Sequence, residues 1–334
     1  MAASCNGLFK KKTNITAAFT LEAVSPNASF DTEAVKKKLN SRLVSKFEEA
    51  DIHIDIAGST IRIGVDNYDS TEIPLTELRQ LLTSRGYLEF LETYDNAEVL
   101  AELVKADASI AAKLASESGS EGLKKDTSLI ARLYETDTLH MERSRISHPL
   151  FFILLPNIDE SGRSIPGPIV GRSLVKDTSA VMRYLNNPEV KVLFPQNIRF
   201  GWYVIRNSDS VLSLISMKNY QSLTSSNGEL LTDAKVEYSK QDGNRPYIAI
   251  TMNALAGEQW AEMTALNVGR SIAIVFDGKV CSYPTVQSRI EGGISNISGD
   301  FTVEEARFLV SILKSGSLPV QLKIVGEEMV HPGK

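Results

Sequence analysis

Few residues in this 334-residue chain have the type and spacing that covalent catalysis requires. Ser311 and Lys314 match the Ser-x-x-Lys pattern of penicillin-recognising enzymes. That chemistry needs partner motifs such as Ser-Asp-Asn and Lys-Thr-Gly, and neither occurs in the sequence. Gly292 and Gly293 lack the strand-to-helix glycine fingerprint that cradles a phosphate. The sequence therefore predicts a lysine near a helix end, a glycine turn or bulge, and no enzyme activity.

Metal and redox chemistry also lack their usual residue patterns. The two cysteines, Cys5 and Cys281, are too few for a four-cysteine zinc site or a disulfide framework, and we expect them not to pair. Neither the histidines nor one group of aspartates shows the spacing of a metal site. These residues are His53, His140, His148 and His331, and Asp51, Asp55, Asp66 and Asp69. We expect no metal and no cofactor.

An apolar run and an aromatic pair are the residues best suited to contact another polypeptide. The candidates are Phe151, Phe152, Leu154, Trp202 and Tyr203. The first three lie in a predicted strand, 151–155, and the last two in a second predicted strand, 199–205. In a small subdomain such side chains either line a groove for unfolded apolar segments or form the subdomain's own core. The residues alone leave both interpretations open.

Length, charge and hydropathy exclude several classes of protein. At roughly 150 residues per domain, the length indicates about two domains. The 43% hydrophobic and 23% charged residues are typical of a globular protein. A net charge of −5 gives no basic balance for phosphate contacts, so we expect no nucleic acid partner. The longest near-apolar run, 149–156, is far shorter than the roughly 20 residues that cross a bilayer.

The N-terminal part predicts the order strand, helix, strand, strand, helix, strand. Residues 19–24 alternate between apolar and polar, and Asp31 can cap a helix that runs to about residue 49. Alternation over 52–65 predicts a hairpin with one buried face. A helix beginning at Pro74 and a strand at 87–93 complete the order.

The last hundred residues repeat that order without repeating the sequence. The predicted strands are 247–252, 271–276, 280–286 and 322–325. Asp277 and Gly278 form a favoured tight turn between the second and third of these strands. Asn253 can cap the first helix, and Thr302 with Glu305 forms a capping box at the start of the second.

The repeated order predicts an α+β fold with two ferredoxin-like βαββαβ halves that form an antiparallel-sheet base. An α+β head subdomain is inserted between the halves, beginning with a helix at 99–114 and a second helix around Leu129 and Leu133. We predict four regions in total. They are a flexible tail at 1–18, the first half of the base at 19–95, the inserted head at 96–234 and the second half at 235–330.

The segment from Asn267 onward carries an ordered series of short motifs. They are Gly269–Ser271, Asp277–Val280, Ser282–Pro284, Gly292–Gly293, Ile297–Ala306 and Leu318–Pro319. Their order and spacing resemble the first large periplasmic domain of SecD, an accessory protein of the Sec translocase. Gly167–Gly171 and Asp177–Thr178 are similar to an insert in SecDF proteins of Bacteroidota-type bacteria. The resemblance covers roughly 19–330, but the family's Leu-Asp-Leu-Arg-Gly-Gly segment and its transmembrane helices are absent.

The resemblance implies a function and a set of structural residues. It implies a periplasmic module that binds unfolded preproteins emerging from the Sec channel and assists export without catalysis. The inserted head would hold the exported chain, and the Sec channel or other SecDF parts would be further partners. The structural motif residues are Asp277, Gly278, Pro284, Gly292, Gly293, Gly299, Phe301, Glu305 and Pro319. The alternative is a SecD-like cell-envelope lipoprotein that acts as a scaffold or binds another ligand.

Cys5 bears on how the chain would meet a membrane. Ala2, Ala3 and Ser4 before Cys5 look like the tail of a lipoprotein signal, although its charged and apolar regions are missing. Cys5 is therefore either a lipidation site or a free thiol in a polar tail. We expect the periplasmic side of the cell envelope, with membrane association only through such a lipid or through transmembrane helices not in this sequence.

Overall fold

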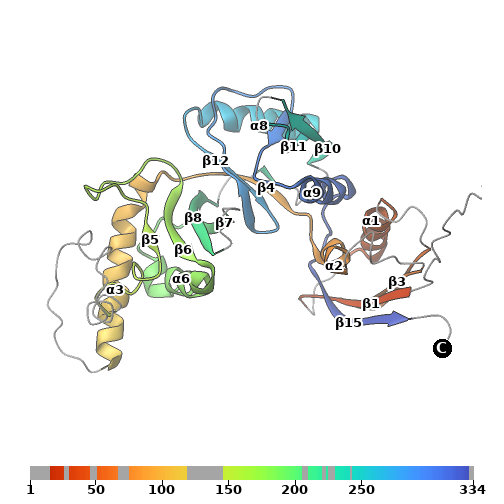
Figure 1. Cartoon of the computed structure of the whole chain (residues 1–334), viewed down its shortest axis with the longest axis horizontal. Helices are drawn as coiled ribbons and strands as arrows, with labels where there is room; N and C mark the ends of the chain where they lie inside the picture. Colours follow the sequence, from red (N-terminus) through yellow and green to blue (C-terminus); the bar gives the residue numbers. More distant parts are fainter. Residues whose placement is uncertain are drawn as a thin grey trace, which may run out of the picture. The chain divides into compact units, whose positions relative to one another are not determined.

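The computed structural model describes residues 16–25, 30–45, 51–66, 75–118, 146–204, 210–219, 223–224, 230–240 and 243–330. Within these ranges the chain has the predicted mixed α+β fold with mainly antiparallel sheets (Figure 1). It divides into two compact units. Unit 1 comprises 1–87, 226–229 and 307–334, and unit 2 comprises 88–225 and 230–306. Cys5, most of the predicted tail and the predicted helix around Leu129 lie outside the described residues.

Unit 1 is built on a four-stranded sheet. Its strands, in spatial order, are β15 (Leu322–Val330), β1 (Thr16–Ala23), β3 (Thr60–Val65) and β2 (Ile52–Ala57). Every neighbouring pair is antiparallel. Alternate residues of β1 are buried, Phe19 and Leu21 among them, because successive side chains of a strand point to opposite faces. The predicted hairpin over 52–65 is confirmed.

Two helices of unit 1 supply the other side of its core. Helix α1 (Thr32–Val44) begins at the predicted cap, where the Asp31 carboxylate accepts the N–H groups of Glu33 and Ala34 at 3.0 and 3.1 Å. Helix α2 (Leu75–Thr83) lies on the same side of the sheet as α1 (Figure 1). Their buried leucines, Leu39 and Leu78 among them, pack into one cluster with the inward residues of β1 and β3.

The buried side chain of Arg42 ties two helix ends together. Its Nε donates to Ser315 Oγ at 2.9 Å, and its Nη2 donates to the carbonyls of Arg85 and Gly316 at 3.0 and 3.1 Å. Its Nη1 donates to the carbonyls of Leu81 at 3.2 Å and of Ser84. Arg42 thus satisfies carbonyls at the ends of α2 and α9 (Val303–Ser315), where a positive charge also favours the helix dipoles.

The pairing of β4 (Leu88–Glu92) and β15 corrects the predicted first half of the base. The sequence order placed β4 as the fourth strand of that half, but β15 takes this position beside β1, and β4 pairs with β12 (Ile272–Phe276) in unit 2. Four of the five β4 residues are buried, so this strand suits a sheet covered on both faces. Strand β15 exposes charged residues such as Lys323 and Glu328, as suits a sheet edge. The pairing therefore does not confirm two self-contained ferredoxin-like halves.

Unit 2 contains an eight-stranded sheet that partly closes on itself. The remaining strands of that sheet are β5 (Leu155–Pro156), β6 (Ile169–Leu174), β7 (Ile198–Val204), β8 (Val211–Lys218), β9 (Leu223–Thr224) and β13 (Lys279–Ser282). Strands β8, β7, β13, β12 and β4 follow one another, and Thr93 after β4 bridges back to Met217 of β8. The buried residues of this ring, Leu91, Ile215 and Val275 among them, form one apolar cluster.

The ring combines parts of the chain that were predicted to lie in different regions. Strands β7 and β8 lie in the region predicted as the insert, 96–234, whereas β4, β12 and β13 lie in the regions predicted as the base. Both sets share one sheet because their apolar faces enclose the same cluster. The limits of the insert stay a prediction.

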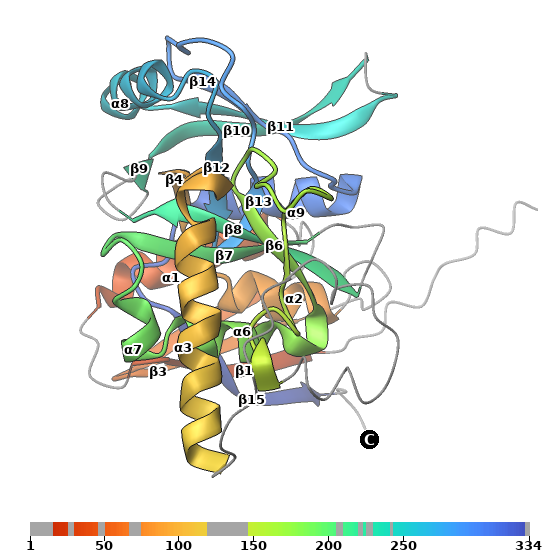
Figure 2. The same ribbon diagram turned by 90° about the vertical axis from the view of Figure 1, so that its left-hand side faces the viewer.

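Helices and a small sheet complete unit 2. Helix α3 (Leu100–Ser118), which follows the 3₁₀ turn η1 (Asn96–Glu98), packs with α6 (Thr178–Leu185) and α7 (Pro188–Lys191) around one apolar cluster (Figure 2). A second 3₁₀ turn, η2 (Val175–Asp177), leads from β6 into α6. The other sheet has the order β10 (Leu231–Ser239), β11 (Arg245–Met252) and β14 (Ile294–Ile297). Helix α8 (Ala254–Leu266) begins at the predicted Asn253 cap, and its Trp260 contacts Phe90 of β4 at 4.9 Å between ring centres.

Replacing Arg42 with Met should lower the free energy of unfolding of unit 1 by about 3 kcal/mol, because it leaves buried carbonyls without donors. Chemical denaturation followed by circular dichroism would measure the loss. Arg79→Met is the matched control, because Arg79 pairs with Glu327 at 2.8 Å on an exposed surface of the same unit. Its cost should stay within about 1 kcal/mol. Equal costs for the two variants would contradict the role given to Arg42.

Candidate functional site

The predicted polypeptide-binding residues do not form one surface. Phe151 and Leu154 are buried in the α3 cluster, and Trp202 packs against that cluster. Tyr203 packs against the ring cluster instead and meets Tyr283 edge to face, with 5.0 Å between ring centres. Phe152 is the exception, since 40% of it is exposed. The core interpretation therefore fits the first three side chains, and Phe152 is the one of the five whose side chain is well exposed.

Residues 151–155 do not form the strand that the apolar run predicted. Only Leu155 and Pro156 are extended, and the preceding residues form a helical turn in which Leu154 N donates to Leu150 O at 2.8 Å. The buried Asp107 of α3 explains the turn, because its Oδ1 accepts the N–H groups of Leu150 and Phe151 at 2.9 and 3.3 Å. Such a carboxylate cap stabilises the first turn of a helix.

Asp107 also holds His148, whose Nδ1 lies 2.6 Å from Asp107 Oδ2. Burial raises the pKa of Asp107 above its ordinary value of 3.8, while His148 and the two backbone N–H groups oppose that shift. The pair fixes the turn that carries Phe152 to the surface. Its geometry serves positioning, because every described contact of the carboxylate is to this turn.

The family-motif residues occupy turns, caps and close contacts. Asp277 and Gly278, with φ of 47° and 81°, form the predicted two-residue turn between β12 and β13. Gly293 lies so close to Gly257 of α8 that a Cβ on it would be 3.2 Å from the Gly257 Cα. Thr302 and Glu305 form the predicted capping box, with Glu305 Oε2 accepting Thr302 N at 2.9 Å.

The remaining motif residues also have structural positions. Gly292 is in the same positive-φ turn as Gly293, and Gly299 lies beneath the ring of Phe301. The carbonyl of Pro284 accepts the N–H of Ile272 at 3.1 Å, and Pro319 follows the end of α9. Cys281 is a free thiol on β13, and burial raises its pKa to about 11. It therefore stays protonated at neutral pH.

Two segments meet β8 at the same place, the chain before β6 and the chain after β4. Residues 211–215 of β8 pair with β6, and the next residue, Ser216, contacts the chain that follows β4. The Ser216 carbonyl accepts Tyr94 N at 3.1 Å, and Ser216 N donates to Pro168 O at 3.1 Å. We call this junction of Thr93–Asp95, Pro166–Pro168 and Ser216 the fork.

A pocket of about 360 Å³ lies at the fork. Its lining residues are Thr93–Asp95, Pro166–Pro168, Gly269–Ser271 and Thr285. The hydroxyl of Thr93 donates to the Ser271 carbonyl at 2.7 Å, which joins the two sides of the pocket. The volume lies within the range of about 300–1,000 Å³ that is typical of ligand pockets.

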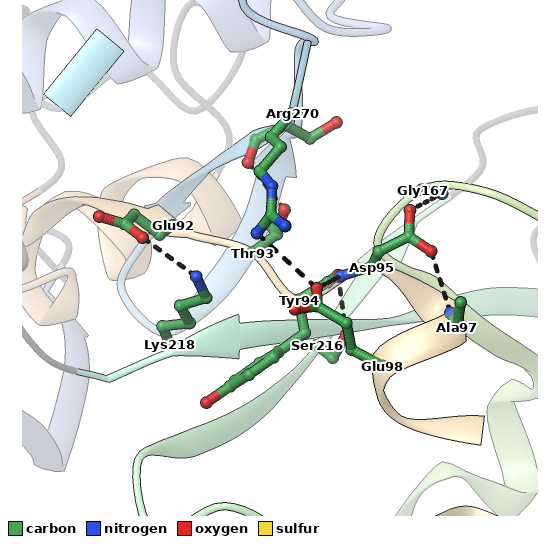
Figure 3. A network of polar contacts seen from close by, with 11 residues as sticks. Glu92, Thr93, Tyr94, Asp95, Ala97, Glu98, Gly167, Ser216, Lys218 and Arg270 are labelled. Carbon is green, nitrogen blue, oxygen red and sulfur yellow. Dashed lines mark hydrogen bonds and ion pairs between the residues drawn. The ribbon is translucent and has the colours of Figure 1, made fainter. Parts of the chain in front are cut away.

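Two carboxylates hold the fork together (Figure 3). Asp95 Oδ1 accepts Ala97 N at 2.9 Å and its Oδ2 accepts Gly167 N at 2.7 Å. Glu98 Oε2 accepts Asp95 N at 2.7 Å, completing a capping box at η1. On the neighbouring strands, Lys218 of β8 pairs with Glu92 of β4 at 3.2 Å, and its Nζ lies 5.4 Å from the ring centre of Tyr94. These contacts fix the pocket wall.

Arg270 extends into this network without a close partner (Figure 3). Within the described residues its guanidinium meets only Glu98, with 3.8 Å between Nη1 and Oε2, and half of its side chain is exposed. The motif pattern in the sequence included Arg270, but it gave no sign of the pocket or of the roles of Asp95 and Asp107. The Asp-x-x-Glu spacing of Asp95 and Glu98 was a usable cap signal, whereas nothing local marks Asp107.

Two general features of the described residues bear on function. No group of three or more His, Cys, Asp or Glu side chains there is arranged to hold a metal ion. None of the helices in the described ranges combines the length and apolar character needed to span a bilayer.

Comparison with known proteins gives consistent matches. The family model described as the SecDF P1 head subdomain matches residues 215–320. The translocase subunit SecD of Rhodothermus marinus is 31% identical over 334 residues, with 92% of this chain and 51% of that protein covered. SecD of Desulfurispirillum indicum is 44% identical over 105 residues, which are 31% of this chain and 20% of that protein. The structure is similar to a crystal structure of SecDF in a super-membrane-facing form, with a TM-score of 0.53 and 20% sequence identity. The aligned region covers 95% of this chain and 30% of the SecDF chain.

The shared fold and the sequence matches together define an α+β domain of the SecDF type. These matches support a SecD/SecDF periplasmic domain in this chain. It spans about half the length of the Rhodothermus relative. The stretch that matches the P1 head model, 215–320, lies largely in the region predicted here as the second half of the base, 235–330.

The Asp107→Asn variant should remove a specific pH dependence of stability. Because the folded-state pKa of Asp107 is raised, its contribution to stability is fully present below pH 3.8 and is lost as pH rises through the raised value. The wild-type advantage in unfolding free energy over Asp107→Asn should therefore shrink across that window. Urea denaturation at several pH values would measure it.

Asp159 provides a control of opposite sign. Hydrogen bonds from Arg163 lower the pKa of this exposed carboxyl, so its contribution is present above pH 3.8 and is lost as pH falls through the lowered value. As pH rises, the difference in unfolding free energy between wild type and Asp159→Asn should therefore grow. The corresponding difference for Asp107→Asn should shrink. Parallel pH profiles for the two variants would contradict the opposite pKa shifts of the two carboxyls.

Proposed function

We propose that this chain acts in protein translocation, as a periplasmic module that binds preproteins emerging from the Sec channel and assists their export. The observation that carries the proposal is the similarity to SecD over 92% of the chain. The further partners would be the Sec channel or other SecDF parts, with no nucleic acid. The location would be the periplasmic side of the envelope, tethered by a lipid on Cys5 or by helices outside this sequence.

The proposed work is binding without catalysis. Two carboxylates with several contacts in unit 2 have structural partners, since Asp95 and Asp107 both accept backbone N–H groups. Retention of an exported chain needs only weak and reversible contact along its length. An apolar side chain near a strand edge can supply such contact, and main-chain hydrogen bonds add to it.

We propose the β5–β6 corner of the insert 96–234 as the contact surface. Phe152 lies just before β5, which is the end strand of the eight-stranded sheet. Half of Leu155 on β5 is exposed, and Leu174 at the end of β6 is also exposed. Ser173 Oγ donates to Ile153 O at 2.6 Å, which holds the two segments side by side. An extended polypeptide could therefore meet exposed apolar side chains beside a strand edge.

The Phe152→Asp variant should bind a permanently unfolded, carboxymethylated polypeptide about tenfold more weakly than wild type, because it loses burial of an exposed ring. Fluorescence anisotropy would measure the affinity. Thermal melting should be nearly unchanged, because Phe152 is not in the core. Val192→Asp is the matched control, since Val192 is also exposed in unit 2 but follows α7 and is not part of β5 or β6. A cooperative fold with unaltered affinity in Phe152→Asp would argue against this surface.

Co-purification would separate the translocation role from that of an independent scaffold. If the chain acts in translocation, the tagged protein should retain the Sec channel when the two are produced together and extracted in mild detergent. An unrelated periplasmic protein carrying the same tag is the control. Absence of the channel from repeated purifications would favour the scaffold alternative.

A further inference from the structure

We propose that the pocket at the fork binds the main chain of an extended, uncharged peptide segment, with Arg270 donating to its carbonyl oxygens. This inference rests on the proposed function and adds a second contact site with a defined chemistry. Three observations support it: the available guanidinium, the engaged carboxylates beside it and the composition of the walls.

The first observation is the unused hydrogen-bonding capacity of the Arg270 side chain. A guanidinium has five N–H donors in a fixed fork. Among the described residues this guanidinium makes no hydrogen bond, and its ion contact with Glu98 is long at 3.8 Å. The half-exposed side chain lines the pocket, so an acceptor that enters can take its donors without displacing a close pair.

The second observation decides between a neutral acceptor and an anion. Asp95 lines the pocket, and Glu98 lies 3.8 Å from the Arg270 guanidinium. Each carboxylate accepts at least one backbone N–H group at 2.7–2.9 Å, which holds it in place (Figure 3). Two fixed carboxylates against one guanidinium disfavour an entering phosphate or carboxylate, because like charges repel. A peptide carbonyl carries no net charge and avoids that cost. The local charges therefore favour main-chain oxygens over an anionic ligand.

The third observation is the composition of the walls. Pro166 and Pro168 have no N–H group, so this wall offers apolar surface and carbonyl oxygens but few donors. The hydroxyls of Ser271 and Thr285 lie 3.5 Å apart at the other side and can accept from peptide N–H groups. Arg270 is thus the main donor, and the hydroxyls are acceptors. An extended peptide needs both, since its N–H and C=O groups alternate along the chain.

The test uses the whole chain and three fluorescein-labelled peptides. The first is a short Ser, Thr, Val and Ala peptide with both ends blocked. The second contains one Asp, and the third has a free C-terminal carboxylate. Arg270→Gln should weaken binding of the blocked peptide about tenfold, the loss typical of a charged hydrogen bond. Binding by the wild type should change little with added salt, because the ligand is uncharged.

Arg289→Gln is the matched control, because Arg289 is an exposed arginine of the same unit and pairs with Glu291 at 3.0 Å away from the pocket. It should bind the blocked peptide as the wild type does. Arg270→Lys keeps the charge but not the planar fork, and should fall between wild type and Arg270→Gln. Melting curves should coincide for all four proteins, since both arginines are exposed.

The outcomes separate this inference from the proposed function. If Arg270→Gln binds the blocked peptide as tightly as wild type, the pocket is not the site, although the proposed function stands. If only the Asp or free-carboxylate peptide depends on Arg270, the ligand is a carboxylate, on a side chain or at a chain end respectively, and the inference is wrong. If wild type binds neither these peptides nor the unfolded polypeptide, the proposed function fails with it.

Discussion

The buried guanidinium of Arg42 is the interaction on which unit 1 depends. A charge this deep is tolerated only when its donors are satisfied, and here the acceptors come from the ends of α2 and α9 and from the residues just after them. These segments are far apart in the sequence, so one side chain specifies where both helices stop. Strand β15 follows directly from the end of α9, and its place beside β1 is therefore linked to that of Arg42.

Unit 2 uses polar side chains in the same way at the fork and around Asp107. Asp95 and Asp107 accept backbone N–H groups of loop and turn residues, which lack the partners of a regular helix or strand. Each carboxylate thereby joins two segments that are distant in the sequence. These carboxylates therefore have structural roles. The contacts that we propose use two other groups, an exposed aromatic ring at a strand edge and a guanidinium beside a pocket. Such groups suit a protein that holds other polypeptides by contact.

The sequence was most informative where the determining contacts are local. The caps at Asp31 and Asn253, the capping box of Glu305 and the turn at Asp277 were predicted correctly, because each depends on residues within a few positions of one another. The composition of residues 151–155 predicts a strand, but only Leu155 is extended. The residues before it form a helical turn, because a carboxylate of α3 accepts the N–H groups of Leu150 and Phe151. The positions of β4 and β15 also depend on distant contacts, because β15 pairs with β1 and β4 pairs with β12. The pocket at the fork comes from three separate segments, which no periodicity brings together.

The position of β15 has a consequence for biogenesis. It pairs along the whole of β1 from the opposite end of the described sequence, so the sheet of unit 1 cannot be completed until nearly all of this chain has left the ribosome. The entropy of closing so long a loop is modest, since each doubling of its length costs only about 0.6 kcal/mol, but contacts this distant in sequence form slowly. During synthesis the open edge of β1 is exposed to other chains. A module that we propose to bind unfolded polypeptides would itself need shielding until its last strand arrives.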